Sequence, residues 1–212
     1  MVAPTDNSLE KNFYNSSHHS GGIIIDIGTG DGLFVYQCAR QNPDKFYIGI
    51  DPNVQQLKKI SEKIYRKPSK GGAPNALFIQ SAVDDLPPEL DGVATEVHVH
   101  FPWGTLLKSV ASGDAQVLGN IRRVCEPQAL LEVVLGLDPE RDASEIARLE
   151  LPAMTLDFIN NVLAPKYLES GFNMTERGII SGEDWPAIQS SWAKRLRGKT
   201  TRPITYWVAV AI

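Results

Sequence analysis

The segment that most constrains the fold is a run of β-branched residues that leads directly into a glycine-rich turn. Ile23–Ile27 contains four isoleucines in five residues and is bounded by glycines, a pattern typical of a buried parallel strand. Three glycines follow within five residues, at Gly28, Gly30 and Gly32. Because glycine has no Cβ, such a turn can adopt positive φ angles and bring the backbone close to a ligand. The segment therefore predicts an α/β fold with a ligand site at its first strand-to-helix turn.

Short apolar segments alternate with longer amphipathic ones along the rest of the chain, which predicts a sheet covered by helices. We predict further strands at 45–50, 75–80, 93–101, 129–135, 173–180 and 204–211, and helices at 31–41, 54–66, 115–124, 140–148, 155–163 and 185–196. A length of 212 residues fits a single domain. We expect a doubly wound α/β domain with a seven-stranded, mostly parallel sheet and helices on both faces. Residues 1–22 are expected to be a poorly structured extension, and residues 136–170 an inserted helical cap.

Composition excludes several other classes of protein. Cys38 and Cys125 are the two cysteines of the chain, too few for a disulfide framework or a four-cysteine zinc site. No apolar run reaches the roughly 18–20 residues that span a bilayer, and residues 1–22 lack the apolar core of a secretory signal. We therefore expect no metal site, no membrane contact and a cytoplasmic location.

Two acidic residues follow the next two predicted strands and extend the candidate ligand site. Asp51 ends the second strand about twenty residues beyond the turn, where a carboxylate can accept hydrogen bonds from both hydroxyls of a ribose. Asp84 follows the third strand, beside Val83, and can accept from an adenine amino group. The turn lacks the G-x-G-x-x-G spacing of dinucleotide folds and the Lys of phosphate-binding loops. This order of motifs resembles class I S-adenosylmethionine-dependent methyltransferases; an NAD-type site or a turn without ligand are the alternatives.

The fourth predicted strand is followed by a tryptophan, Trp103, within Phe101–Thr105 (FPWGT). In the methyltransferases that the chain resembles, the loop after this strand lies over the reactive methyl group, and enzymes acting on exocyclic amines usually carry Asp or Asn there. A ring nitrogen such as adenine N1 already has an in-plane lone pair, so it needs positioning and a π surface instead of a base. Trp103, preceded by the rigid Pro102, suits that chemistry; packing at the sheet edge is the alternative interpretation.

A second tryptophan, Trp192, precedes a basic run near the C-terminus. If the segment before the last strand folds over the cofactor, Trp192 can face Trp103 and sandwich a flipped base. Stacking contributes roughly 1–3 kcal/mol per base, and flipping costs a similar few kcal/mol. Because the two free energies are comparable, contacts with RNA phosphates are needed as well to make base flipping favourable.

Basic residues are concentrated in two segments of a chain whose net charge is −4. The two segments carry Lys58, Lys59, Lys63, Arg66, Lys67 and Lys70, and Lys194, Arg195, Arg197, Lys199 and Arg202. The rest of the chain has 10 basic against 24 acidic residues. Such segregation can build a positive face that binds a phosphate backbone. A solvated helix face and a basic loop are the alternative.

Five stretches of the chain are similar to the aminoglycoside-resistance 16S rRNA (adenine 1408-N1)-methyltransferases, the Kam and Npm group. They are Asp26–Gly32, Phe46–Pro52, Lys67–Gly72, Phe101–Leu107 and Ser191–Leu196, of which FPWGTLL and SWAKRL are the most specific. The resemblance implies a class I (Rossmann-like) methyltransferase fold that binds the assembled 30S subunit and flips an adenine of helix 44 between two tryptophans. It also implies that S-adenosyl-L-methionine is the methyl donor, S-adenosyl-L-homocysteine its product, and aminoglycoside resistance the consequence.

Carried over residue by residue, the resemblance implies three functional groups. The catalytic group is Trp103 and Trp192, with Pro102 shaping the pocket. The cofactor-binding group is Asp26, Gly28, Thr29, Gly30, Asp51, Val83, Asp84, Thr105 and Ser190. The RNA-binding group is drawn from both basic segments: Lys63, Arg66, Lys67, Lys70, Lys194, Arg195, Arg197, Lys199 and Arg202. Within it, Arg202 is the candidate for stabilising the flipped nucleotide.

Two other functions remain open at this point. One is an S-adenosylmethionine-dependent methyltransferase that acts on tRNA, another RNA or a small molecule, although the paired basic segments argue against a small metabolite. The other is a catalytically weak homologue that only binds the cofactor and the ribosome; the intact glycine turn and both tryptophans argue against it. We expect the chain to be a monomer.

Overall fold

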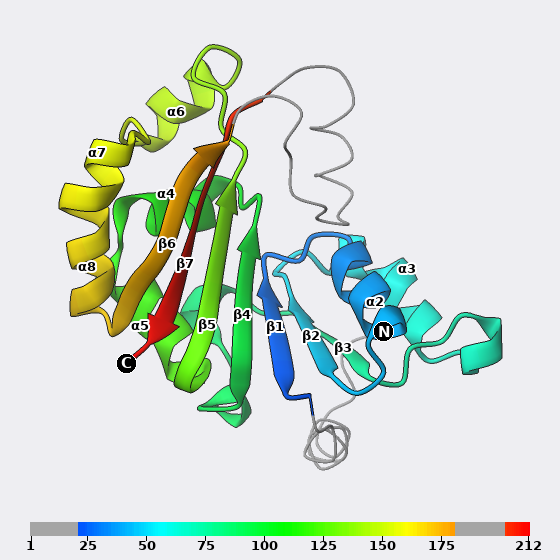
Figure 1. Cartoon of the computed structure of the whole chain (residues 1–212). Coiled ribbons are helices and arrows are strands. Elements are labelled where there is room, and N and C mark those ends of the chain that lie inside the picture. The colour runs from blue at the N-terminus through cyan, green and yellow to red at the C-terminus, as the bar shows by residue number, and fades with distance from the viewer. Residues whose placement is uncertain (1–20, 181–201) are drawn as a thin grey trace.

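The computed structural model describes residues 21–180 and 202–212, which form a seven-stranded mixed sheet (Figure 1). The strands are β1 (Ile23–Ile27), β2 (Phe46–Ile50), β3 (Ala76–Ile79), β4 (Ala94–His100), β5 (Cys125–Leu135), β6 (Phe172–Ile180) and β7 (Ile204–Ala211). Their order is β3-β2-β1-β4-β5-β7-β6. Strands β1 to β5 are parallel, and β7 runs antiparallel between β5 and β6. The prediction of a mostly parallel, seven-stranded sheet is confirmed.

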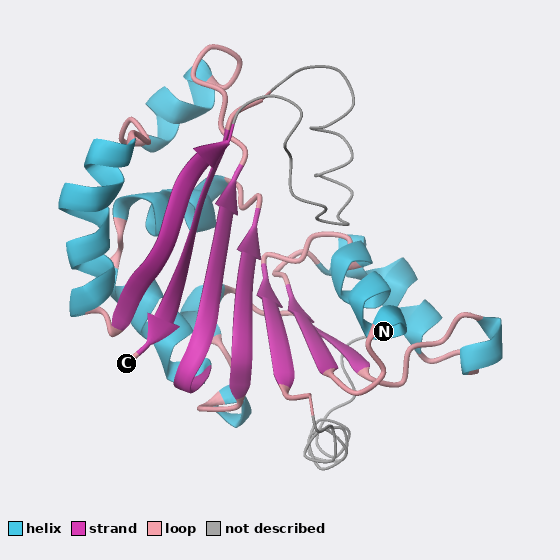
Figure 2. Ribbon diagram, in the orientation of Figure 1, coloured by secondary structure: helices cyan, strands magenta, loops and turns pink. Residues whose placement is uncertain are grey.

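Helices cover both faces of this sheet (Figure 2). They are α2 (Leu33–Gln41), α3 (Val54–Ile64), α4 (Gly104–Ser112), α5 (Ala115–Val124), α6 (Ala143–Leu149), α7 (Leu156–Phe158) and α8 (Ala164–Glu169). Shorter 3-10 turns are η1 (Pro68–Lys70), η2 (Val83–Asp85) and η3 (Pro88–Leu90), and η4 (Ile159–Leu163) is one turn of π-helix. The sequence predicts only a loop after β4, whereas α4 begins at Gly104, directly after the tryptophan. The predicted helix at 185–196 lies outside the described residues.

Alternation along β1 sends its side chains into two separate cores. Ile24 packs with Val35 of α2 and Ile60 of α3 on one face of the sheet. Ile25 and Ile27 belong to the larger core on the opposite face, which α4, α5 and α8 cover. This two-sided burial is the reason that the strand is continuously apolar.

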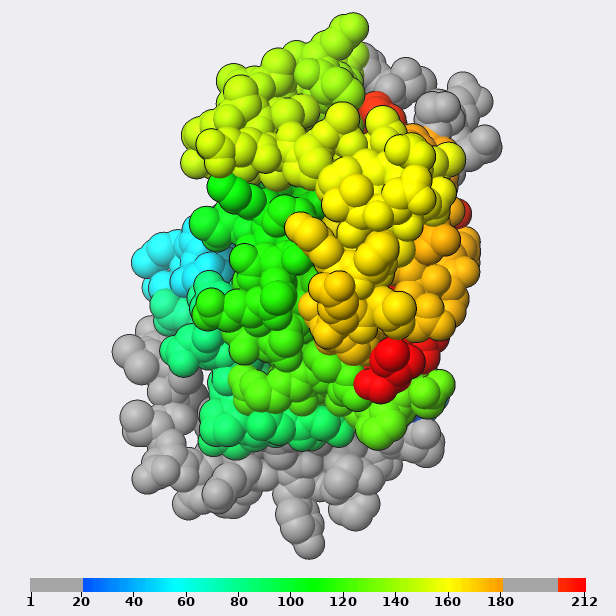
Figure 3. All heavy atoms as spheres, turned by 90° about the vertical axis from the view of Figure 1, so that its left-hand side faces the viewer, coloured from blue at the N-terminus to red at the C-terminus, as the bar shows by residue number. Residues whose placement is uncertain are grey.

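The segment 136–170 differs from the expected inserted cap in its second half. Ile159, Leu163 and Tyr167 are fully buried in the larger core. Their helices lie alongside β6 on the outside of the sheet, as the yellow and orange atoms of Figure 3 show. The chain has to cross from β5 to the edge strand β6, and the helices of this crossing bury one apolar face against the sheet. Residues 143–149 (α6) remain near the carboxyl ends of the strands (Figure 1).

Both cysteines lie in surroundings that make a thiol unreactive. Burial raises the pKa of Cys125 to about 12 and that of Cys38 to about 11. The thiols therefore stay protonated near neutral pH and pack as small apolar groups. Among the described residues, no helix is long and apolar enough to cross a membrane.

Candidate functional site

The glycine-rich turn between β1 and α2 is held by the carboxylate of Asp51, at the end of β2. Gly28, Gly30 and Gly32 have φ angles of 77°, 60° and 69°, a region that favours glycine. The backbone nitrogen of Gly30 donates to Oδ2 of Asp51 at 2.9 Å, and that of Asn53 donates to Oδ1 at 2.8 Å. Each carboxylate oxygen retains a further lone pair for a ligand hydroxyl. Asp51 thus fixes the turn and can bind a ribose from the same position.

The turn is packed closely against its neighbours. A Cβ atom at Gly32 would lie 2.4 Å from the ring of Phe78, and one at Gly28 would lie 2.8 Å from the side chain of Leu106. Leu106 belongs to the first turn of α4, so this contact places the start of α4 against the glycine turn. The tight backbone and the Asp51 carboxylate fit a nucleoside cofactor such as S-adenosylmethionine.

Asp26, at the end of β1, is 3% exposed and heads a row of ionisable side chains. In the sheet register Asp26 pairs with His98 of β4, and His98 pairs with Glu132 of β5. The rings of His98 and His100 stack with centroids 4.9 Å apart, and Nε2 of His100 lies 2.5 Å from Oε1 of Glu132. Burial raises the pKa of Asp26, and the nearby His100 opposes that shift. The row connects the glycine turn to the partly exposed face of β5.

The third predicted acid lies on a short turn after β3. Val83 and Asp84 begin η2, which is closed by a 2.5 Å hydrogen bond from Oγ of Ser81 to the carbonyl of Asp85. Val83 packs against the larger core, whereas Asp84 is exposed. Since β3, β2 and β1 are parallel neighbours, this turn lies at the same edge of the sheet as Asp51 and the glycines.

An unusual backbone conformation at the end of β4 presents the tryptophan of the FPWGT stretch. Phe101 has a φ angle of 50°, a left-handed conformation that a bulky side chain rarely adopts. Its ring is buried against Val134 and Ile204, and its backbone nitrogen donates to the carbonyl of Val134 at 2.7 Å. Pro102 is also buried, but Trp103 is 48% exposed. The anchored Phe101 therefore turns the chain so that the indole points out of the core.

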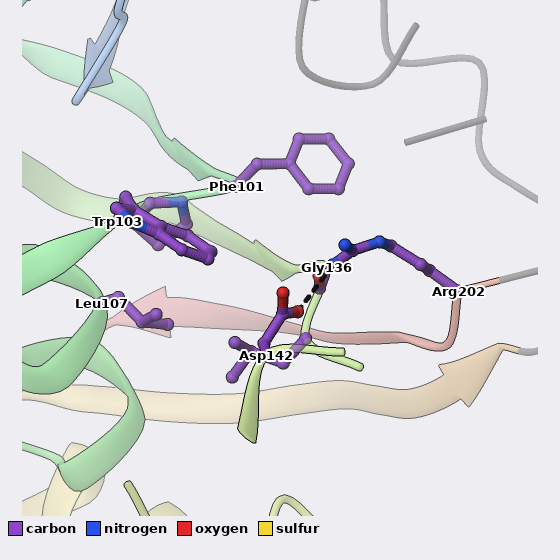
Figure 4. A pocket seen from close by; sticks show the side chains of 8 residues that line it. Phe101, Trp103, Leu107, Gly136, Asp142 and Arg202 are labelled. Atoms are coloured by element: carbon purple, nitrogen blue, oxygen red, sulfur yellow. Dashed lines mark hydrogen bonds and ion pairs between the residues drawn. The ribbon is translucent and has the colours of Figure 1, made fainter. Parts of the chain in front are cut away.

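Trp103 lines a pocket together with a partly buried ion pair (Figure 4). Nη1 of Arg202 lies 2.6 Å from Oδ2 of Asp142 and 3.4 Å from the carbonyl oxygen of Gly136. The same Asp142 oxygen accepts from the backbone nitrogen of Asp138 at 2.9 Å. The lining is completed by Phe101, Pro102, Leu107 and Leu137. An aromatic surface and a held guanidinium thus share one pocket at the carboxyl ends of β4 and β5, and the start of α4 connects it to the glycine turn.

The first basic segment forms a separate surface on α3 and the loop after it. Arg66, Lys67 and Lys70 are exposed, and Lys63 is partly buried with Nζ 4.1 Å from the centroid of the Tyr36 ring. We refer to Lys63, Arg66, Lys67 and Lys70 as the basic surface. Glu62, exposed on α3 beside Lys63, is the one acidic residue of the segment 58–70. The basic surface lies on the side of the sheet that α2 and α3 cover (Figure 1).

A family model, curated relatives and solved structures name the same family of methyltransferase. The family model described as NpmA, 16S rRNA (adenine(1408)-N(1))-methyltransferase, matches residues 5–211. The chain belongs to this family. A relative of that name from Streptoalloteichus tenebrarius is 36% identical over 181 residues, which is 85% of this chain and 82% of the relative.

Two solved structures agree with this family in fold. The aminoglycoside resistance methyltransferase NpmB1 superposes with a TM-score of 0.81 at 41% identity, covering 96% of this chain and 92% of its own. The 16S rRNA (adenine(1408)-N(1))-methyltransferase of Catenulisporales acidiphilia, solved as a mutant with its cosubstrate SAM, gives a TM-score of 0.88 at 33% identity and covers 98% and 93%. The fold is thus that of class I methyltransferases, as predicted.

Most of the predicted cofactor residues that the structure describes lie close together. Asp51 is hydrogen-bonded to Gly30, and Asp26 interacts with Thr29. Thr29 is buried within the glycine turn, and Thr105 is exposed in the first turn of α4. Ser190, Trp192, Lys194, Arg195, Arg197 and Lys199 lie outside the described residues, so their predicted roles stay predictions.

Arg202 lies apart from the basic surface, in the pocket that Trp103 lines. The sequence places it among the RNA-binding residues of the second basic segment, as the candidate for stabilising the flipped nucleotide, and the structure holds it in the Trp103 pocket against Asp142. Its side chain is 19% exposed. The reason is that Asp142, 60 positions earlier in the chain, lies beside the start of β7 in the fold. This proximity favours a role at the base over a role in surface docking.

Two residues of the site are not predicted from the sequence. Asp142 carries no motif, and only its burial at 8% exposure and its contact with Arg202 reveal it. Arg40 of α2 lies outside both basic segments, yet its Nη1 is 3.4 Å from the carbonyl oxygen of Pro68 in the basic loop. The sequence signal that could have identified Arg40 is its position as a basic residue in the last turn of α2.

Proposed function

We propose that this chain transfers the methyl group of S-adenosylmethionine to N1 of adenine 1408 of 16S rRNA. The proposed substrate is the 30S subunit, in which helix 44 presents the adenine, and the proposed consequence is aminoglycoside resistance. We further propose that the chain acts as a monomer, without a metal ion, in the cytoplasm. Family membership supports the reaction, and the Trp103 pocket, connected to the glycine turn through α4, is the observation that carries it for this chain.

In the proposed methyl transfer, the main task of the protein is to position the adenine against the methyl group. When bound, S-adenosylmethionine supplies an electrophilic methyl group. Adenine N1 offers an in-plane lone pair and carries no proton, so no general base is required. The carboxylate in the pocket is already engaged, since Oδ2 of Asp142 accepts from Arg202 and from the backbone of Asp138. Trp103 would therefore orient the ring and face the positive charge that the base acquires.

The cofactor side depends on the carboxyl ends of three neighbouring strands. Asp51 would accept from the ribose hydroxyls, and Val83 with Asp84 would contact the adenine ring. Asp26, Thr29, Thr105 and the backbone of Gly28 and Gly30 would surround the rest of the cofactor, with Ser190 as a further proposed contact. The contact between Gly28 and Leu106 supports this arrangement, because it joins the glycine turn to the element that carries Trp103.

The RNA side combines the basic surface with the second basic segment. Trp192 is the proposed second face of the base sandwich, and Lys194, Arg195, Arg197 and Lys199 are proposed phosphate contacts. Arg202 is proposed to stabilise the flipped nucleotide from within the pocket. Lys63, Arg66, Lys67 and Lys70 would bind phosphates at a distance from the pocket.

The direct test is methylation of purified 30S subunits with labelled S-adenosylmethionine, and then primer extension to map the modified base. We expect a stop at adenine 1408. Trp103→Ala should abolish transfer while leaving the cofactor Kd within about twofold of the wild type, and Trp103→Phe should retain part of the activity because it keeps a π surface. Bound cofactor without label on 30S, or label competed away by tRNA, would overturn the proposal, as would full activity of Trp103→Ala.

A further inference from the structure

The loop after α3 is built rigidly, although all of its side chains from Arg66 to Lys70 are exposed. The backbone nitrogens of Lys70 and Gly72 both donate to the carbonyl oxygen of Lys67, at 2.7 and 3.1 Å. Gly71 adopts a φ angle of 86°, and a Cβ atom at Gly72 would lie 1.6 Å from the carbonyl oxygen of Arg66. The loop therefore has one tightly closed conformation that depends on both glycines.

One buried side chain connects this loop to α2, which precedes α3 in the chain. Tyr36, in α2, is 9% exposed, and its hydroxyl donates to the carbonyl oxygen of Gly71 at 2.9 Å. The ring of the same tyrosine lies under Nζ of Lys63, 4.1 Å from its centroid. Tyr36 thus contacts a lysine of α3 with its ring and the loop of Lys67 and Lys70 with its hydroxyl. In Figure 1 the loop extends beyond α2 and α3 at the right-hand edge of the molecule.

We propose that Tyr36 is a positioning residue for RNA binding: it fixes the spacing between Lys63 on α3 and the lysines of the next loop without touching RNA itself. A phosphate backbone presents charges at fixed intervals, so cations held at a matching spacing lose less conformational entropy on binding than cations on a mobile loop. The inference rests on the proposed function, because it takes the basic surface to dock rRNA.

The arrangement also explains the partial burial of Lys63. A lysine placed over an aromatic face keeps its ammonium group oriented and available on its outer side. Arg40 adds a second, weaker contact from α2 to the loop, at the carbonyl oxygen of Pro68. The two helices and the loop therefore form a single unit. The hydrogen bond from the Tyr36 hydroxyl to Gly71 joins segments that are 35 positions apart in the sequence.

The test compares Tyr36→Phe with the wild type in binding to 30S subunits over a series of salt concentrations. The variant keeps the ring, and hence the core packing and the contact with Lys63, but loses the hydrogen bond to Gly71. We expect 30S affinity to fall about two- to tenfold. The slope of log K against log salt concentration should decrease in magnitude by about one, because one loop cation no longer engages its phosphate. The Kd for S-adenosylmethionine should stay unchanged.

Tyr47→Phe is the matched control, because it also removes a buried tyrosine hydroxyl from the same apolar cluster, but from β2 beside Asn42 and Cys38. It should lower Tm about as much as Tyr36→Phe and leave the salt slope unchanged. A Tyr36→Phe variant with wild-type affinity and slope would overturn the positioning role. If the wild-type chain itself shows no salt-dependent 30S binding, the proposed function fails instead, so the two failures are distinguishable.

Discussion

Phe101 shows how one residue in an uncommon backbone conformation can place a functional neighbour. A left-handed φ angle costs a bulky residue of the order of 1–3 kcal/mol, and it persists only where the surroundings over-determine it. Here the ring is buried at 8% exposure beside Val134 and Ile204, and its amide is hydrogen-bonded to β5. The result is a sharp exit from β4 that leaves Trp103 exposed at the pocket while Pro102 stays buried.

Asp142 belongs to no sequence motif, yet we expect its substitution to disturb the Trp103 pocket strongly because it holds Arg202. Asp142→Asn removes the charge that holds Arg202, in an ion pair whose side chains are 19% and 9% exposed. Loss of such a charge-assisted hydrogen bond should cost about 2 kcal/mol, equivalent to a decrease in Tm of roughly 4–8 °C. Methyl transfer to 30S should fall about tenfold while the cofactor Kd is unchanged.

The control for this substitution is Glu145→Gln, which breaks the exposed pair with Arg148 on the neighbouring helix α6. Thermal melting and single-turnover methylation of both variants provide the measurement. The control should behave as the wild type. An Asp142→Asn enzyme with wild-type turnover and Tm would show that Arg202 is held by other contacts.

At the scale of single residues, the sequence predicts contacts that a local motif determines and misses contacts that join distant segments. Asp51 could be placed next to Gly30 because adjacent parallel strands bring their carboxyl ends together. The pairing of Asp142 with Arg202 could not, because it joins two segments 60 positions apart with no periodic pattern between them. Trp192 belongs to a specific motif, but its position relative to Trp103 depends on a segment outside the described residues.

Strand β4 illustrates how a secondary-structure element combines packing with polar chemistry. Its odd-numbered residues Val97 and Val99 are fully buried in the larger core, whereas Glu96, His98 and His100 occupy the opposite face. Phe34 of α2 covers part of that face, with its ring centroid 4.9 Å from that of His100. An alternating strand in the middle of a parallel sheet is unusual, and here it produces the ionisable row that reaches Asp26.

The carboxylate of Glu96, on the same face of β4, should make stability depend on acid pH. Hydrogen bonds from His98 and from Lys45, whose Nζ lies 2.9 Å from Oε1, hold the pKa of Glu96 at about 2, below the ordinary value of 4.5. A depressed pKa in the folded state contributes stability that is present above pH 4.5 and lost as the pH falls toward 2.

Urea unfolding of the wild type and of Glu96→Gln across this range gives the measurement. The variant should be less stable at neutral pH, and the difference should shrink as the pH falls through the window between the two pKa values. Lys45→Ala, which removes one of the two donors, should move the loss of stability to higher pH. A difference between wild type and Glu96→Gln that stays constant with pH would contradict the assignment.

Secondary-structure elements can be predicted where apolar periodicity is strong and are missed where it is interrupted. The isoleucine run of β1 and the alternating apolar pattern of β7 are each compatible only with a strand, and the structure confirms both strands. Helix α4 is missed because its first residue, Gly104, disfavours helix and has a φ angle of 60°. In the crossing from β5 to β6, which is predicted as a cap, Pro152 and Pro165 interrupt the helical pattern. In the structure the π-helical turn ends at Leu163 and Pro165 occupies the first turn of α8, so the helical segment continues past the second proline.

At the scale of the whole molecule, the distribution of charge matters more than its sum. A chain of net charge −4 would be repelled by RNA if its charges were spread evenly. The basic surface instead lies on the α3 side of the sheet, whereas Lys166 of α8 lies on the opposite side, where its Nζ donates to the carbonyl oxygen of Ser112 at 2.8 Å. The molecule is therefore expected to approach its substrate in one orientation.

This orientation predicts that basic residues on the two sides differ in their effect on binding. Lys67→Ala should weaken 30S binding and reduce the magnitude of the salt slope by about one, because one phosphate contact and its released counterion are lost. Lys166→Ala removes the same charge from the far side and should leave the slope unchanged. Filter binding at several salt concentrations, with bound S-adenosylmethionine measured in parallel, distinguishes the two. Equal slopes for both variants would mean that net charge, and not the basic surface, governs the approach to the ribosome.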